Sequence, residues 1–345
     1  MKNEFITIGG TTRDISFFDN HGIPVDNCRG KFCRKLLAFE PGAKIKVDKF
    51  YYSYGGGAAN AAVCLANFGF KVSCLAPIGD DENGRFIKEN LKKRRVDISL
   101  MRTVKREESG SSFILVSPTG ERIIFAQRGA NVKLKINSSD LESLKKTKYV
   151  YIASLAGAWR ENLRKIFSAV GHNHHWIFWN PGTTQYLGGP ERIAPFLKKV
   201  TVLASNQEEA QKLLRSSKKY RQLNEEFLNN PDNLVKILHD LGPKIVIITL
   251  GAAGVIVYDG KKFYRRNIIK EKRRVDTTGI GDIFNSSFAA GLALYKGDIN
   301  KALRLGLKNA ALKVAYLGAH HDHLLKLKDI KAPRPKNGRK VKNKK

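Results

Sequence analysis

The sequence reads "RRVDTTGIGDIFNSSFAAGLALY" over residues 273–295. Gly279 and Gly281 flank Ile280, and Asp282 follows where an apolar run with helical spacing begins. A helix start presents unpaired N–H groups and the positive end of the helix dipole, so it binds anions. Glycines there let the backbone approach the anion closely. We therefore expect the amides of Ile280, Gly281 and Asp282 to surround a phosphate.

The carboxylate of Asp282 adds a second chemical group to this turn. A carboxylate placed beside a hydroxyl can act as a general base. Stabilising the transferred phosphoryl group and activating its acceptor are the main demands of phosphoryl transfer. The alternative is a glycine-rich turn in which Asp282 only caps the helix. The spacing alone leaves both interpretations open.

Outward from this stretch, short apolar strands alternate with helical segments. Such alternation predicts an α/β fold with a mostly parallel sheet and helices on both faces. The apolar run at 245–250 fits a strand buried on both sides. The alanine-rich segment 58–69 and residues 282–295 have helical spacing. The segments 22–54 and 100–128 do not fit the alternation, and they predict a small separate β-sheet that covers a cleft.

The length and net charge of the chain limit the number of domains and the kinds of partner to expect. A chain of 345 residues is long enough for one large α/β domain or two smaller ones. Its formal net charge of +31 attracts anions. The basic residues are spread along the whole chain without the aromatic interleaving of an RNA-binding surface. We expect the basic tail 331–345 to be disordered and nucleic acid not to be a specific partner. A non-catalytic nucleic-acid-binding protein remains the alternative.

The chain ends and the hydropathy predict a cytoplasmic protein. Its beginning, "MKNEFITIGG", lacks the basic-then-apolar layout of a signal peptide. The longest nearly apolar run, residues 245–258, is too short to span a bilayer. We therefore expect no membrane partner.

The cysteines and histidines lack the spacing that is typical of a metal centre. Cys64 and Cys74 lie in apolar segments and are expected in the core. The pair in "CRGKFC" (28–33) has no second pair or nearby histidine to complete a zinc set. "HNHH" (172–175) and "HHDH" (320–323) lack the i, i+4 helical pairing that places two imidazoles on one face.

Two common nucleotide-binding motifs are missing. No G-x-x-x-x-G-K-[ST] sequence occurs, which excludes a P-loop protein. "GGGAAN" and "GIGDIF" do not complete G-x-G-x-x-G after a strand, so a dinucleotide-dependent oxidoreductase is only weakly supported.

Several short motifs in register resemble the PfkB (ribokinase-like) family of carbohydrate and nucleoside kinases. "DTTGIGD" (276–282) is similar to that family's C-terminal signature, with Ile280 in place of the usual alanine. The other similar motifs keep the family's order, so the resemblance covers about residues 4–325: "GGTTRDI" (9–15), "GGGAANAAVCLANFG" (55–69), "IGDDENGRF" (78–86), "SNQEEA" (205–210) and "TLGAAG" (249–254).

The resemblance implies a fold and an activity. The fold is a ribokinase-like three-layer α/β/α domain over residues 1–330, with a mostly parallel central sheet and a small β-sheet lid from about 11–54 and 100–128. The activity is ATP-dependent transfer of the γ-phosphate to a hydroxyl of a sugar or nucleoside. "GGGAAN" has alanines where ribokinases usually carry Lys-Gly, so ribose, fructose, adenosine and other acceptors remain open. Lid strands in this family can pair between subunits, which implies a possible homodimer.

The resemblance also implies residue roles. Asp282 is the catalytic base, and the anion hole is formed by Gly279, Ile280 and Gly281. The substrate hydroxyls are held by Asp14, Gly55, Gly56 and Asn60. Mg²⁺ is organised through water and phosphate by Asn206 and Glu209. The ATP site is lined by Asn206, Thr249, Gly251, Gly254 and Asn309. A monovalent cation such as K⁺ is implied beside Asp276 and Thr278.

Overall fold

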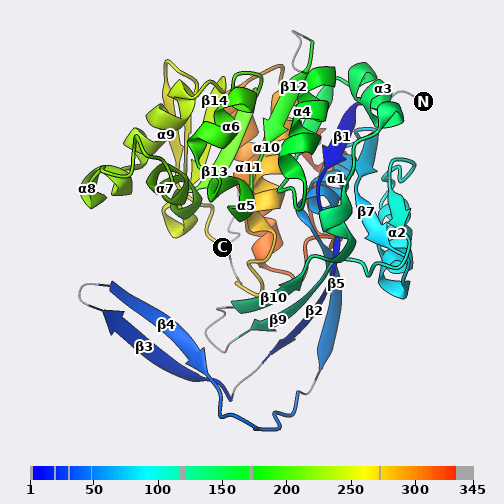
Figure 1. The fold of residues 1–345 in the computed structure, drawn as a ribbon, viewed down its shortest axis with the longest axis vertical. Helices are drawn as coiled ribbons and strands as arrows, with labels where there is room; N and C mark the ends of the chain where they lie inside the picture. Colours follow the sequence, from blue (N-terminus) through cyan, green and yellow to red (C-terminus); the bar gives the residue numbers. More distant parts are fainter. Residues whose placement is uncertain are drawn as a thin grey trace, which may run out of the picture.

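The structure is a computed structural model whose two main sheets differ in size. A large sheet lies between helical layers, and a smaller sheet extends from one end of it (Figure 1). The described residues are 3–18, 21–29, 32–47, 49–116, 122–170, 174–271 and 273–331. The expectation of a disordered tail at 331–345 lies outside these residues except for Lys331.

The large sheet has eight strands in the order β16-β15-β14-β13-β12-β11-β1-β6. The six strands β6, β1, β11, β12, β13 and β14 run parallel, and β15 and β16 are antiparallel at one edge. This arrangement confirms the predicted mostly parallel α/β fold. The strands are β1 (Phe5–Ile8), β6 (Val72–Leu75), β11 (Tyr149–Ile152), β12 (Trp176–Trp179), β13 (Val202–Asn206), β14 (Ile245–Thr249), β15 (Val255–Tyr258) and β16 (Phe263–Arg266).

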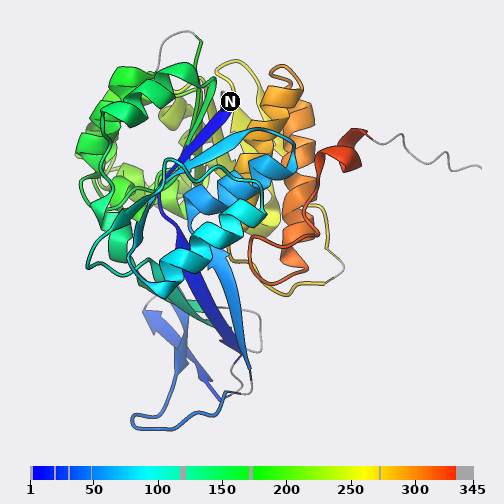
Figure 2. The same cartoon turned by 90° about the vertical axis from the view of Figure 1, so that its right-hand side faces the viewer.

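Helices cover both faces of this sheet because its strands are apolar on both sides. Along β1, Phe5 packs into one core cluster, whereas Ile6 and Ile8 pack into the other. Figure 2 separates the two helical layers. The first cluster contains α1 (Gly57–Asn67), α2 (Glu82–Lys93), α10 (Ile280–Leu294) and α11 (Ile299–Val314). The second contains α4 (Trp159–Ala169), α6 (Pro190–Leu197), α7 (Gln207–Arg215) and α9 (Pro231–Asp240). The remaining helices are α3 (Ser138–Lys146), α5 (Thr183–Tyr186), α8 (Glu225–Asn229), α12 (Leu327–Lys331), η1 (Gly129–Lys133) and η2 (Gly251–Ala253).

The smaller sheet, here called the lid sheet, has four strands in the order β10-β9-β2-β5. A separate hairpin of β3 and β4 projects beyond it (Figure 1). The strands are β2 (Thr12–Phe18), β3 (Ile23–Arg29), β4 (Phe32–Ala38), β5 (Phe50–Gly55), β9 (Ser111–Val116) and β10 (Arg122–Gln127). β8 (Arg102–Val104) pairs instead with β7 (Pro77–Gly79), so the second lid segment begins at Ser111 rather than at residue 100.

The described residues contain no cluster of three or more His, Cys, Asp or Glu that could hold a metal ion. The ring of His320 bonds to the side-chain amide of Asn90 at 2.8 Å, and burial lowers its pKa to about 3. Cys64 and Cys74 are buried free thiols. The side chains of the "CRGKFC" pair and part of "HNHH" lie outside the described residues. Among the helices described, none combines the length and hydropathy that a bilayer span requires.

Candidate active site

The glycine turn forms the start of α10. Gly279 has a φ of +74°, a left-handed conformation that favours glycine, and the helix begins at Ile280. The first helical hydrogen bond runs from the Ile283 amide to the Gly279 carbonyl at 3.0 Å. The amides of Gly281 and Asp282 precede it and have no acceptor within the helix. The Ile280 side chain packs against the core, so its bulk does not obstruct the turn.

Open space lies in front of Gly281. A Cβ atom added there would meet no protein atom within 4 Å. Neither helix packing nor backbone strain therefore requires glycine at this position. The missing side chain matters only for something outside the protein that approaches the turn, which fits an anion at the helix N-terminus.

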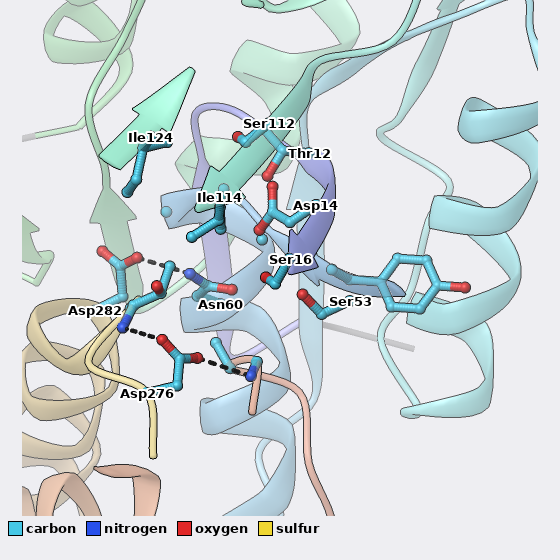
Figure 3. A pocket seen from close by; sticks show the side chains of 18 residues that line it. Thr12, Asp14, Ser16, Ser53, Asn60, Ser112, Ile114, Ile124, Asp276 and Asp282 are labelled. Carbon is cyan, nitrogen blue, oxygen red and sulfur yellow. Dashed lines mark hydrogen bonds between the residues drawn. The ribbon is translucent and has the colours of Figure 1, made fainter. Parts of the chain in front are cut away.

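Asp282 is half-buried in the first turn of α10, and α1 fixes its carboxylate. Its Oδ2 accepts a hydrogen bond of 2.8 Å from Asn60 Nδ2 (Figure 3). Burial raises the pKa of the Asp282 carboxyl, and the Asn60 hydrogen bond acts against that rise. A carboxylate held in one orientation with a raised pKa is suited to accept a proton.

A first pocket of about 200 Å³ lies between the lid sheet, α1 and the start of α10. Three of its lining side chains carry a buried oxygen without a hydrogen-bond partner among the described residues: Asp14 Oδ1, Asn60 Oδ1 and Thr278 Oγ1. Unpaired buried acceptors are costly unless a ligand donates to them. The polar side chains that line the pocket, most of them labelled in Figure 3, are Thr12, Asp14, Ser16, Ser53, Tyr54, Asn60, Ser112, Asp276, Thr278 and Asp282. This lining suits a small molecule with several hydroxyl groups.

Glycines at the end of β5 make room for this arrangement. A Cβ on Gly55 would lie 2.2 Å from Asp14 Oδ2. Gly56 has a φ of +88°, and a Cβ there would lie 2.4 Å from the carbonyl oxygen of Gly10. Burial raises the pKa of Asp14, the hydrogen bonds of Thr12 and Ser112 lower it, and the charge of Asp276 raises it.

A second pocket of about 220 Å³ lies on the other side of Asp282. Gly279 and Asp282 line both pockets, so the carboxylate stands at their boundary. The remaining lining residues come from the carboxyl ends of β12, β13 and β14 and from α7 and α10: Asn180, Ser205, Asn206, Glu209, Thr249, Gly281 and Asn285. Ligands of open α/β sheets bind at these strand ends.

Residues 27–325 match the sequence profile of the pfkB family carbohydrate kinases. The chain belongs to this family. It is 26% identical to an ATP-dependent 6-phosphofructokinase from Thermoanaerobacterium thermosaccharolyticum over 84% of this chain and 88% of the relative. It is 30% identical to a ribokinase from Bacillus subtilis, over 77% and 82% of the two chains. A solved Arabidopsis thaliana ribokinase complexed with ribose and ATP has the same fold, with a TM-score of 0.76, 22% identity and coverage of 96% and 98%.

As a pfkB family kinase, the protein is a phosphotransferase that acts on a hydroxyl group of a sugar or nucleoside. Family members use ATP, typically with Mg²⁺. The ribokinase-like three-layer fold is likewise confirmed.

The residues expected to organise Mg²⁺ fit that role. The side chains of Asn206 and Glu209 cap α7 reciprocally, with bonds of 2.8 and 3.0 Å to each other's amides. Burial raises the pKa of Glu209, and the charge of Asp282 adds to that rise. Asn285 Oδ1 is buried in the same pocket without a partner among the described residues. These oxygens are the donor type that Mg²⁺ and its waters prefer.

The residues expected at the nucleotide site do not all reach it. Thr249 lines the second pocket. Gly254, with a φ of +98°, shapes the turn after β14, where a Cβ would lie 2.1 Å from the Arg266 carbonyl oxygen. Gly251 belongs to the same turn and is exposed. Asn309 is fully buried between helices, where its amide donates to Ser287 Oγ at 2.8 Å, so the structure does not bring it to the pocket.

The residues expected beside a monovalent cation do not fit one. The ammonium group of Lys313 lies 2.8 Å from Asp276 Oδ2 and 3.0 Å from the Asp276 carbonyl oxygen. Asp276 Oδ1 accepts from the Thr278 amide at 2.7 Å. A positive charge of the chain itself therefore occupies the place where the resemblance implied a bound ion.

Sequence reasoning missed three residues of this region. Asn180 directly follows β12, and the strand-end rule could have identified it. Asn285 lies three residues after Asp282, and helical spacing places it on the same side of α10. Lys313 gave no signal, because a lone lysine in an amphipathic helix ordinarily faces solvent.

Proposed function

We propose that this protein transfers the γ-phosphoryl group of ATP to a hydroxyl group of a small sugar. The observation that supports the proposal best is the position of Asp282, which lines both pockets while Asn60 holds its carboxylate. An acceptor in the first pocket and a nucleotide in the second would meet at this side chain.

In the proposed reaction, Asp282 accepts the proton of the acceptor hydroxyl. The oxygen then forms a bond to the γ-phosphorus as the bond to the β-phosphate oxygen breaks, and ADP leaves. The free amides at the start of α10 stabilise the charge on the transferred group. Asp14 and Asn60 orient the acceptor by accepting hydrogen bonds from its other hydroxyl groups.

Mg²⁺, when bound, would neutralise charge on the phosphates. Glu209 and Asn206 would hold it through water, and Asn285 offers a further oxygen nearby. Thr249 lies beside them at the end of β14, where it would contact the nucleotide, and Gly254 keeps that turn in shape.

The lining of the first pocket favours an unphosphorylated sugar as acceptor. No Lys or Arg is among the described residues that line it, and an acceptor phosphate would need such a charge. Tyr54 is the one aromatic residue of that lining, and its ring stacks on His320 with centroids 6.2 Å apart. A nucleoside base would therefore find little free aromatic surface there.

ADP release across a panel of sugars, sugar phosphates and nucleosides tests this proposal. We expect saturable turnover with one or more free sugars and little with sugar phosphates or nucleosides. Turnover confined to a nucleoside would overturn the sugar assignment but keep the kinase. No turnover with any acceptor, while ATP still binds, would refute the proposed reaction.

We also propose that a second copy of the chain covers the outer face of the lid sheet. Tyr52, Ile15, Phe113 and Phe125 form one row across its four strands. Tyr52, Phe113 and Phe125 are 63%, 50% and 60% exposed, which is unusual for neighbouring aromatic side chains. Light scattering should show a dimer that Phe113→Ser shifts toward monomer. A monomeric wild-type protein at micromolar concentration would contradict the proposal.

A further inference from the structure

Lys313 lies on α11 and has no solvent-exposed surface. Its ammonium group donates to Asp276 Oδ2 at 2.8 Å, to the Asp276 carbonyl at 3.0 Å and to the Tyr316 carbonyl at 3.1 Å. An ammonium group has three N–H donors, and each has an acceptor here. Lysines are almost never fully buried unless they are paired. Lys313 is therefore a buried, fully hydrogen-bonded residue of the interior rather than a surface lysine.

The partner carboxylate ties together two segments of the active site. Asp276 Oδ1 accepts from the Thr278 amide at 2.7 Å, directly before the glycine turn. Its Oδ2 also accepts from the Gly318 amide at 2.9 Å (Figure 3). Gly318 and Ala319 line the first pocket, and a Cβ on Gly279 would lie 3.0 Å from Ala319 Cβ. Displacing Asp276 would therefore move the start of α10 relative to the pocket.

We propose that the Lys313 ammonium replaces a bound monovalent cation in holding this carboxylate, and that the reaction does not depend on K⁺. The proposal rests on the proposed kinase function for its activity readout only. Lys313 is a positioning residue, because it acts on the site through Asp276.

The chemistry of the contacts carries this inference. In potassium channels, rings of backbone carbonyl oxygens replace the hydration shell of the ion, and rings of carboxylates select cations in other channels. Lys313 uses oxygens of that type, with the same unit charge. A second cation on the same oxygens would be repelled at short range in a poorly solvated site. Because the ammonium is tethered to α11, it is present at any salt composition.

The wild-type protein gives the first test. Its kcat and KM are measured in KCl and in choline chloride at equal ionic strength, and its melting temperature is recorded in both salts. We expect both sets of values to agree closely between the salts. A saturable activation by K⁺, or a K⁺-dependent rise in melting temperature that choline does not give, would overturn the proposal.

Substitution at Lys313 gives the second test. Lys313→Ala removes the charge and leaves space, so in choline chloride we expect kcat to fall roughly 10–100-fold, as misplaced catalytic groups do. KCl or ammonium chloride should restore part of the rate and raise the melting temperature of this variant. Lys313→Met fills the same space without charge, and neither salt should restore it.

Controls separate this inference from the kinase proposal. Lys308→Ala removes an exposed lysine from the same helix and should match the wild type in both salts. If Lys313→Ala kept full activity and stability in choline chloride, the positioning role would be wrong. If the wild-type protein phosphorylated no acceptor, the proposed function would fail, whereas the salt dependence of the melting temperatures would still decide the role of Lys313.

Discussion

The carboxyl group of Asp282 combines two properties that are in tension. It is desolvated enough that burial raises its pKa, yet a general base must be ionised to work. The Asn60 hydrogen bond of 2.8 Å favours the ionised form and so limits that rise. The same bond fixes the oxygen that would face the acceptor. Asn60, a residue of α1, thus orients the carboxylate of Asp282 at the start of α10.

Asp282→Asn should abolish most turnover while the fold and ATP binding persist. Loss of a general base typically costs about 10²–10⁴-fold in rate. ATP binding by calorimetry and a far-UV spectrum serve as controls for the fold. Near-normal kcat in this variant would contradict the assignment of Asp282 as base.

The same variant should be more stable than the wild type at neutral pH. Because the folded-state pKa of Asp282 is raised, ionisation destabilises the folded protein once the pH exceeds that pKa. The destabilisation disappears as the pH falls through the raised pKa toward the ordinary carboxyl value of about 3.9. Urea unfolding at several pH values measures it. A stability difference between wild type and variant that did not shrink on acidification would argue against this account.

At the level of elements, the turn before α10 separates two kinds of glycine. Gly279 adopts a φ of +74° and is required by the backbone, whereas Gly281 is helical and faces open space. At position 279 glycine is needed for the backbone conformation. At position 281 a side chain would obstruct only a ligand that approaches the turn. A substitution at each position therefore reports on a different property of the same turn.

Gly281→Ala should keep or raise the free energy of unfolding and yet weaken catalysis. Alanine in a helix is favoured over glycine by roughly 0.5–1 kcal/mol. Its methyl group would occupy the space where the phosphate is proposed to approach, so the KM for ATP should rise or kcat should fall. Gly279→Ala is the matched comparison and should lose stability, because a left-handed residue other than glycine costs about 1–2 kcal/mol. Full activity in Gly281→Ala would contradict the anion-site proposal.

Patterns that depend on neighbours in the sequence could be predicted, and those that depend on tertiary contacts could not. The parallel sheet followed from buried strands such as 245–250, and the turn at Gly279 from glycine spacing. The parallel pairing of β8 with β7 was missed because three-residue strands have no periodicity. Asn309 and Lys313 lie on one helix. Asn309 was expected at the nucleotide site and Lys313 was overlooked, since only packing against α10 and Asp276 decides what their polar groups contact.

At the scale of the whole molecule, the formal net charge is +31, whereas the two pockets beside Asp282 are lined by several carboxylates. Long-range attraction would draw anionic ATP toward the protein, and salt would screen it. The first pocket, by contrast, contains Asp14, Asp276 and Asp282 and suits a neutral acceptor. The overall charge and the acceptor pocket thus favour different ligands.

Deleting residues 331–345 should leave kcat unchanged. Every residue that lines either pocket precedes position 320, so the tail adds no group to the proposed chemistry. Steady-state kinetics of the shortened chain measure this, and retention on heparin or RNA at increasing salt measures any electrostatic role of the tail. A large fall in kcat on deletion would show that the tail belongs to the active site.

The lid strands enter the chain as two excursions, one between β1 and α1 and one between β8 and η1. The groups proposed to handle the nucleotide come from strand ends and helices after residue 180. Part of the acceptor preference therefore lies in two segments that can vary between relatives without a change in the large sheet, whereas Asn60 on α1 lies outside them. Selection could move such a gene from one sugar to another through changes before residue 128, while the residues of the nucleotide pocket stayed the same.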